Sequence, residues 1–215
     1  MVPQNIEEEE IVFNTIQDYL NENKILDREK VINRIKSNFS KVSININQEG
    51  IIKHIDSLIK KKRIVEGSKL TKDGVLLNTN RKKIYDFIKT NPGTYFYKIT
   101  NELNMGNQLV FWHLNFLIEF ELIKKAIIEN HEIYFISSLS VEEGKRLYYT
   151  IKEESKKILD YLKADDSGAT KKKLSLELDL APKTVTKYIE SLEKFNFLDK
   201  KKISEKETLY FSKET

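Results

Sequence analysis

The stretch from Arg81 to Phe135 constrains the fold of this chain more than any other. Apolar residues at helical spacing predict helices over residues 81–89, 94–103 and 107–120. The Asn91-Pro92-Gly93 triplet separates the first two helices, because proline cannot continue a helix and glycine permits the turn. Three short helices in succession, with tight turns between them, are therefore expected.

Two β-rich runs follow the third predicted helix, over residues 122–128 and 132–135. They flank Glu129-Asn130-His131, a pattern that predicts a β-hairpin. Three helices followed by a hairpin is the element order of a winged helix-turn-helix, in which the hairpin is the wing.

The stretch begins with IY-x-FI-x-x-NPG, continues with a predicted helix and a short turn, and ends with WHL-x-x-L-x-x-F-x-x-I and a closing IYF. This order resembles the winged helix-turn-helix transcriptional regulators common in archaea. The resemblance implies DNA binding, with the third helix in the major groove and the wing against the backbone or the minor groove. The motif is specific for the fold and much less so for the function.

The same pattern recurs further along the chain. Leu114, Leu117 and Phe120 have counterparts 75 residues later at Ile189, Leu192 and Phe195. The predicted fold class is mainly α with small β-hairpin wings (α+β), as tandem winged-helix domains. We expect three domains, over residues 1–72, 73–140 and 141–215.

The first block has the weakest wing signal. Asp27 and Asn47 are predicted to cap helices over residues 28–39 and 48–62. Ser43 to Ile46 reads as a short strand or an extended link, and residues 63–67 read as the entry to a wing. The apolar run Val75, Leu76 and Leu77 then predicts that the first helix of the middle block begins earlier. A continuous helix would then connect the first block to the middle block.

The last block predicts a long helix over residues 141–162 and shorter helices over 169–178 and 183–195. Its wing strands are expected over residues 198–203 and 208–211.

The composition of the chain limits how strongly it can be expected to bind DNA. Charged residues make up 33% of the chain, but the formal net charge is only +4 and no block is strongly basic. DNA binding would therefore rest on local patches. The chain has no cysteine, which excludes disulfides and thiolate metal sites. Neither a signal peptide nor an apolar run of membrane-spanning length is present, so we expect a cytoplasmic protein without a membrane partner.

The resemblance implies a set of outward, DNA-facing positions on the third helix of the middle block: Asn107, Gln108, Phe111, Trp112 and Asn115. Asparagine and glutamine can pair bidentately with adenine and so suit base readout. Phe111 and Trp112 depart from a polar pattern. The alternative for them is an interface with a neighbouring domain or with a second subunit.

In the last block the resemblance places on the outward face Lys183, Thr184, Thr186, Lys187 and Glu190. Two lysine triplets bracket this helix in the sequence, namely Lys171, Lys172 and Lys173 before it and Lys200, Lys201 and Lys202 after it. Such a distribution suits phosphate contacts. The alternative is an ordinary solvated face in a lysine-rich chain.

The chain offers little for catalysis or metal binding. His54, His113 and His131 are scattered and have no metal-ligand spacing, so no metal and no cofactor are expected. His113 is expected to be a hydrogen-bonded structural histidine. A glycine-rich phosphate loop, an H-E-x-x-H motif and a nucleophile elbow are all absent from the sequence. We therefore expect no enzyme.

Two function classes remain. The first is a transcriptional regulator that binds double-stranded DNA, alone or as a homodimer. The second is a scaffold for protein partners, because tandem winged helices also build endosomal-sorting subunits and polymerase-associated factors. A positive stripe along the third helices and wings would favour DNA. An apolar patch around Trp112 would favour a protein partner.

Overall fold

The computed structural model describes residues 4–23, 25–41, 46–205 and 207–213. The predicted link at Ser43 to Ile46 lies outside the described residues except for its last member. The chain divides into two compact units. The first holds the residues up to Asp86 together with Leu103–Ile123, and the second holds Phe87–Glu102 together with the residues from Lys124 onward.

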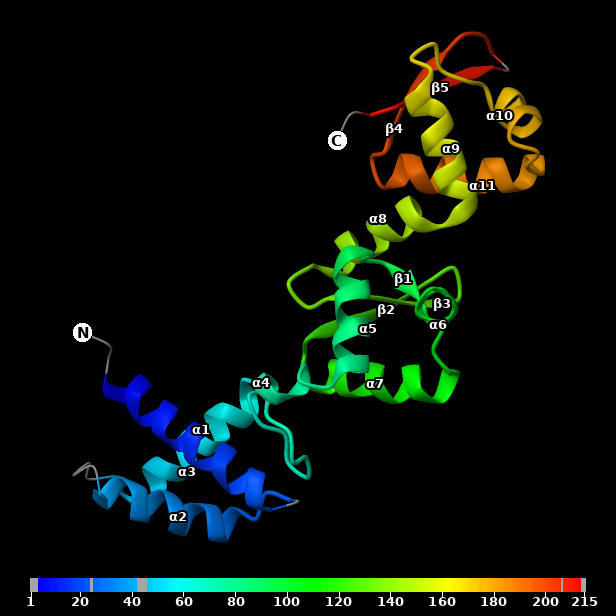
Figure 1. The fold of residues 1–215 in the computed structure, drawn as a ribbon. Helices are drawn as coiled ribbons and strands as arrows, with labels where there is room; N and C mark the ends of the chain where they lie inside the picture. Colours follow the sequence, from blue (N-terminus) through cyan, green and yellow to red (C-terminus); the bar gives the residue numbers. More distant parts are fainter. Residues whose placement is uncertain (1–3, 24, 42–45, 206, 214–215) are drawn as a thin grey trace. The chain divides into compact units, whose positions relative to one another are not determined.

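Figure 1 labels the elements along the chain. The helices are α1 (Gln4–Glu22), α2 (Arg28–Lys41), α3 (Gln48–Lys60), α4 (Lys72–Val75), α5 (Thr79–Thr90), α6 (Phe96–Leu103), α7 (Asn107–Glu119), α8 (Val141–Ile151), α9 (Glu153–Ala164), α10 (Lys171–Glu177) and α11 (Pro182–Lys194). The strands are β1 (Thr94–Tyr95), β2 (Ile123–Ile128), β3 (His131–Ile136), β4 (Leu198–Lys202) and β5 (Thr208–Ser212). The predicted fold class, mainly α with small β-hairpin wings, is confirmed.

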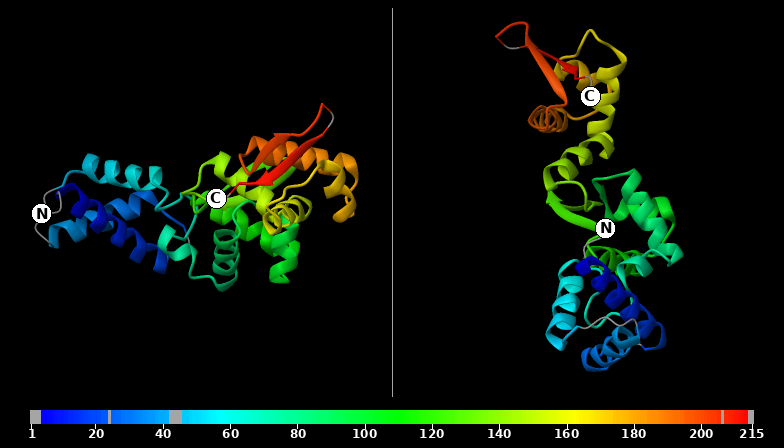
Figure 2. Two further views of the ribbon diagram at one scale, coloured as in Figure 1. Left: turned by 90° about the horizontal axis from the view of Figure 1, so that it is seen from above. Right: turned by 90° about the vertical axis from the view of Figure 1, so that its left-hand side faces the viewer.

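In the first unit, α1, α2 and α3 pack against one another (Figures 1 and 2). Their apolar faces form one buried cluster that includes Phe13, Ile35 and Ile55. Both predicted caps are confirmed. The Asp27 carboxylate accepts a hydrogen bond from the backbone N–H of Lys30, and the Asn47 side chain accepts one from Gly50.

The wing of the first block is reduced to a single antiparallel bridge between Ile64 and Thr71. The expected continuous helix through residues 75–77 is wrong. Thr71 caps the short helix α4 through its hydroxyl, and α5 begins only at Thr79. The Asn78 side chain accepts a hydrogen bond from the backbone N–H of Arg81, so a side-chain cap replaces helical continuity here.

The middle block has the element order α5, β1, α6, α7, β2, β3. The order agrees with the prediction except at Thr94–Tyr95, which forms strand β1 instead of the start of a helix. Thr94 pairs with Tyr134 and Tyr95 pairs with Ile133, which gives a sheet with the strand order β1-β3-β2.

The second unit corrects two predicted helices. The long helix expected over residues 141–162 is broken at Lys152, whose extended backbone separates α8 from α9. The buried Ser155 hydroxyl lies 2.6 Å from the carbonyl oxygen of Tyr149 and 3.0 Å from that of Lys152, so it can satisfy a carbonyl at the break. In addition, α10 begins at Lys171 rather than at Ala169, because Ala169 forms a bridge to Tyr210.

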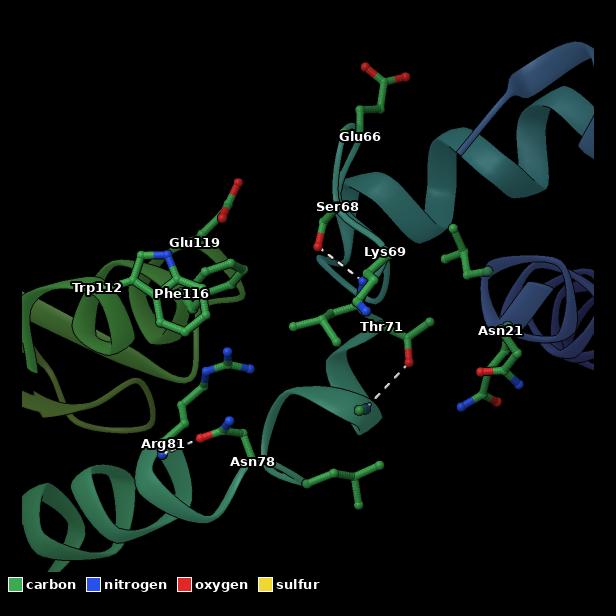
Figure 3. Close-up of a pocket in the computed structure, with 16 residues that line it drawn as sticks. Asn21, Glu66, Ser68, Lys69, Thr71, Asn78, Arg81, Trp112, Phe116 and Glu119 are labelled. Atoms are coloured by element: carbon green, nitrogen blue, oxygen red, sulfur yellow. Dashed lines mark hydrogen bonds between the residues drawn. The ribbon is translucent and has the colours of Figure 1, made fainter. Parts of the chain in front are cut away.

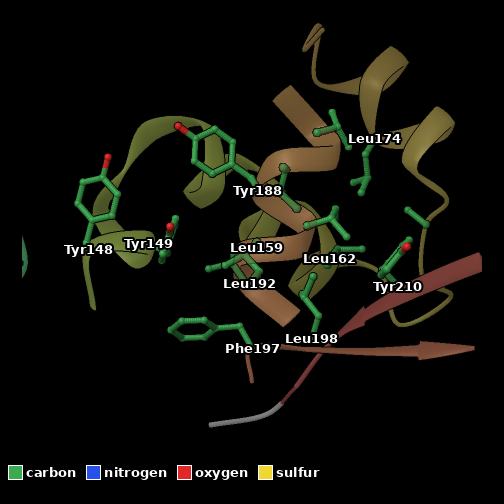
Figure 4. Packing of buried hydrophobic residues seen from close by; sticks show 14 of the residues in the cluster. Tyr148, Tyr149, Leu159, Leu162, Leu174, Tyr188, Leu192, Phe197, Leu198 and Tyr210 are labelled. Atoms are coloured by element: carbon green, nitrogen blue, oxygen red, sulfur yellow. The ribbon is translucent and has the colours of Figure 1, made fainter. Parts of the chain in front are cut away.

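A single buried cluster joins β3 and α8 to α9, α10, α11 and the β4–β5 hairpin (Figure 4). Tyr148 and Tyr149 of α8 meet with ring centroids 5.2 Å apart, and Tyr149 also lies 6.3 Å from Tyr188 of α11. These aromatic contacts hold α11 and its hairpin on the rest of the unit.

None of the helices within the described ranges is both long enough and apolar enough to cross a bilayer. The three domain boundaries proposed from the sequence stay predictions.

Candidate nucleic-acid interface

Helix α11 presents one buried and one open face. Pro182 occupies its first turn, where the missing N–H has no helical partner to lose. The buried face consists of Val185, Tyr188, Ile189 and Leu192. Lys183 and Lys187 are exposed, while Thr184 and Thr186 are half-buried. The outward positions expected from the resemblance therefore do lie on the accessible side of this helix.

The eight lysines that the sequence predicts to face DNA from α10, α11 and β4 fall into two groups by their contacts. Half of them pair with carboxylates, through Lys171–Glu190 at 3.9 Å, Lys173–Asp165 at 3.6 Å, Lys187–Glu129 at 2.9 Å and Lys200–Glu193 at 2.6 Å. The Glu193 carboxylate raises the pKa of Lys200. A hydrogen bond with the Tyr161 hydroxyl is the main cause of the raised pKa of Lys173. These four cations are already partly neutralised.

The other group consists of Lys172, Lys183, Lys201 and Lys202. All four are exposed, and none has an ion pair with any residue in the described ranges. They come from α11, from the helix α10 that precedes it and from the wing strand β4 that follows it (Figure 1). An unpaired cation can bind a phosphate without first losing a carboxylate partner.

Lys187 has a contact that the sequence did not predict. Its ammonium group pairs with Glu129, which lies at the turn of the β2–β3 hairpin and has a side chain only 14% exposed. The Tyr149 hydroxyl donates a second hydrogen bond to the same carboxylate, at 3.2 Å. Lys187 is thus held by a neighbouring wing, and its predicted role at DNA stays a prediction.

Helix α7 carries the second candidate face. Asn107, Gln108 and Asn115 are exposed, as the resemblance implied. Phe111 is 59% exposed and Trp112 is 51% exposed, so this face combines amides with two large aromatic rings. The Trp112 ring meets Phe116 edge-on, with centroids 4.7 Å apart.

His113 lies on the opposite side of α7 and is buried. The hydrogen bond expected for this histidine is not found, because neither ring nitrogen has a partner among the described residues. Burial lowers the pKa of His113, and the nearby charge of Arg81 lowers it further. The neutral imidazole is therefore the form that the fold accommodates.

A pH-dependent stability follows from this lowered pKa. Below the ordinary histidine pKa of about 6.5, the unfolded chain takes up a proton that the folded chain resists. We expect the free energy of unfolding to fall between pH 7.5 and pH 5.5. The slope from one proton cannot exceed about 1.4 kcal/mol per pH unit. Urea denaturation of the wild type and of His113→Met measures the difference. If both lose stability equally with acid, His113 is not the group responsible.

No group of three or more histidine, aspartate or glutamate side chains in the described part of the chain is placed so that it could hold a metal ion.

Comparisons with known proteins agree with the element order of the last block. Residues 155–194 match the family model for winged helix-turn-helix DNA-binding domains, a range that covers most of α9 and all of α10 and α11. Residues 155–194 therefore resemble a winged helix-turn-helix DNA-binding domain in sequence, and their three helices follow in the order expected of one. The structure adds its wing, the β4–β5 hairpin, beside α11 (Figure 2).

The chain is also similar to an archaeal regulator. It is 31% identical over 132 residues to an uncharacterized HTH-type transcriptional regulator of Methanocaldococcus jannaschii. The match covers 61% of this chain and 33% of that protein, so the chain spans about a third of the relative.

Two solved structures of the endosomal ESCRT-II complex are also similar over nearly the whole chain. One is 13% identical and covers 96% of this chain and 88% of its own, with a TM-score of 0.27. The other is 12% identical and covers 97% and 90%, with a TM-score of 0.23. Scores this low support no functional argument.

Proposed function

We propose that this chain is a transcriptional regulator that binds duplex DNA through α11, α10 and the β4–β5 hairpin. The observation that carries the proposal is the winged helix-turn-helix match over residues 155–194, in a block whose unpaired lysines flank its third helix. Similarity to an archaeal HTH-type regulator supports the same reading. The proposed activity is binding without catalysis, and the cytoplasmic location expected from the sequence suits it.

The positions of the side chains assign some of them to phosphate contacts and others to base contacts. Lys172, Lys201 and Lys202 reach phosphates, because they lie on the helix before α11 and on the wing after it. Lys183 and Thr184 lie in the first turns of α11, the part of a recognition helix that reaches base edges. The amides Asn107, Gln108 and Asn115 supply a second readout face in the proposed middle domain.

Replacement of Lys172, Lys183, Lys201 and Lys202 by glutamine tests this proposal. Each lost phosphate contact should reduce the slope of log affinity against log salt concentration by roughly 0.9. We therefore expect a much shallower salt dependence and weaker binding to AT-rich duplexes, measured by fluorescence anisotropy at several salt concentrations.

A matched control removes the same amount of charge elsewhere. Lys60, Lys83, Lys89 and Lys163 are exposed, lie outside α10, α11 and the hairpin, and take part in none of the ion pairs found between described residues. Their fourfold glutamine variant should keep most of the wild-type salt slope. Equal loss in both variants would mean that net charge, not this interface, governs binding.

One observation favours a second candidate function. Phe111 and Trp112 place two half-exposed aromatic rings on the outward face of α7, and such rings are more typical of protein contacts than of base contacts. A homodimer or a protein partner at this face is the alternative. Absence of DNA binding at low salt, in the wild-type chain, would leave this protein-contact function as the better proposal.

A further inference from the structure

The first unit contains a cavity of about 810 Å³ that the proposed DNA interface does not use (Figure 3). Its lining residues come from α1, from the chain between residues 66 and 81, and from α7, and all of these lining residues belong to that unit. Its size lies within the range of small-molecule sites in proteins. The lining combines apolar side chains such as Leu20, Leu70 and Leu77 with the amides of Gln17, Asn21 and Asn78.

Arg81 is the unusual member of this lining. It is only 2% exposed, yet no carboxylate among the described residues pairs with it. Its Nη1 donates to the carbonyl oxygen of Val75 at 2.9 Å, and its Nε is buried with no hydrogen-bond partner among the described residues. Burial lowers the pKa of Arg81. A buried cation without a counter-ion is costly in a folded protein, so the guanidinium of Arg81 points to an anion that the described residues do not supply.

The surroundings of the guanidinium indicate the shape of that anion. Its carbon lies 4.5 Å from the centroid of the Phe116 ring and 5.5 Å from that of Trp112 (Figure 3). Both rings line the same cavity. A guanidinium is a planar donor that binds a carboxylate in the same plane. Aromatic side chains such as these pack well against the flat ring of a ligand.

The acidic residues of the lining do not serve as the counter-ion. Glu66 is engaged by Arg28 at 2.9 Å. Glu119 is exposed, and its carboxylate points away from the Arg81 guanidinium in Figure 3. Lys69 adds a second cation to the lining, with no ion pair to any described residue. The cavity therefore offers two positive groups to an incoming ligand.

We propose that this cavity binds a small aromatic carboxylate, with the carboxylate on Arg81 and the ring against Trp112 and Phe116. Asn78 and Lys69 supply further donors to the anion. Trp112 and Phe116 belong to α7, so the ligand would touch the helix that also carries Asn107 and Gln108. The binding itself does not depend on the proposed DNA function.

The fluorescence of Trp112 can report on binding in the cavity, because it is the single tryptophan of the chain. Benzoate is titrated into the intact protein without DNA, and tryptophan emission is followed. We expect a saturable change with a Kd in the millimolar range or below, as suits so small a ligand. Benzyl alcohol lacks the charge, cyclohexanecarboxylate lacks the flat ring and inorganic phosphate lacks both the carboxylate and the ring. Each of the three should bind more weakly.

Variants assign the site. Arg81→Gln should weaken benzoate binding by roughly ten- to a hundredfold, the usual effect of losing a hydrogen bond to a charged group. Arg81→Lys should fall between, because it keeps the charge without the planar fork. If Arg81→Gln does not fold, Arg81→Lys tests the role of the guanidinium in its place. Arg146→Gln is the matched control, since Arg146 stacks on Phe197 at the same 4.5 Å but lies outside the cavity.

Three results would each overturn the proposal: no saturable change with benzoate, unchanged benzoate affinity in Arg81→Gln, or equally tight binding of benzyl alcohol or phosphate. Because the titration contains no DNA, its failure is distinguishable from a failure of the DNA-binding proposal.

Discussion

Replacing Gly93 with alanine should destabilise the second unit by about 2–5 kcal/mol, the sum of a strained backbone and an unavoidable clash. Gly93 has φ +87°, a conformation that residues with a Cβ rarely adopt. A Cβ at this position would also lie 2.4 Å from the backbone nitrogen of Tyr148 and 2.8 Å from the carbonyl oxygen of Gly144. Both atoms belong to the α8 backbone, so no side-chain rotation can relieve the contact.

The role of Gly93 explains why this contact is tight. Its N–H donates to the carbonyl oxygen of Tyr134, directly before β1 pairs with β3. On the other side, Gly144 lets α8 approach the Phe135 ring, which a Cβ there would meet at 2.4 Å. The two glycines together let α8 pack onto this sheet.

Urea denaturation followed by circular dichroism measures the effect. Gly67→Ala is the matched control. Gly67 has φ +76°, but apart from its two chain neighbours no described residue has an atom within 4 Å of the position that an alanine methyl group would occupy there. It should show only the backbone cost, about 1–2 kcal/mol. If Gly93→Ala and Gly67→Ala lose equal stability, α8 can shift away and the close approach is not a rigid feature.

The elements that the sequence predicted well are those set by local chemistry. Asp27 and Asn47 cap helices through their own side chains, and Asn91-Pro92-Gly93 marks a helix end wherever the chain goes afterwards. The helical spacing of Ile189 and Leu192 likewise indicates which side of α11 is buried, and hence which side is open.

The elements that were missed depend on distant partners. Thr94 and Tyr95 are a strand only because β3 pairs with them. The break at Lys152 contains neither glycine nor proline, and it is accommodated by the buried Ser155 hydroxyl and by packing. Local propensity carries no signal for either feature, since tertiary contacts decide both.

The candidate site shows the same division. Exposure of the lysines around α11 follows from periodicity, but their availability does not. Lys187 pairs with Glu129, which lies 58 positions away in the chain. The sequence places Arg81 only at the start of a predicted helix, and the fold shows that it is buried beside two aromatic rings. Charge counts along a sequence therefore overstate the cations that are free to bind a ligand.

The second large effect concerns the helix proposed to read DNA. Leu192 of α11 is fully buried and belongs to the same apolar cluster as Leu159 and Phe197 (Figure 4). Truncation to alanine removes this packing and leaves a cavity, so Leu192→Ala should reduce the free energy of unfolding by about 2–5 kcal/mol. Because α11 and its wing are held by this cluster, we also expect weaker DNA binding as the temperature rises, before the whole chain unfolds.

Leu176→Ala is the control for Leu192→Ala. It makes the same substitution within a helix, but at a position that has little packing to lose. Leu176 lies on α10 in the same unit but is 72% exposed, so the same change should alter stability by no more than about 0.5 kcal/mol. Urea denaturation and duplex binding at two temperatures are measured for both variants. Should Leu192→Ala lose stability yet bind DNA like the wild type at both temperatures, the cluster stabilises the unit without positioning α11. The interface would then have to be sought on α7, where Asn107, Gln108 and Asn115 form the other open face.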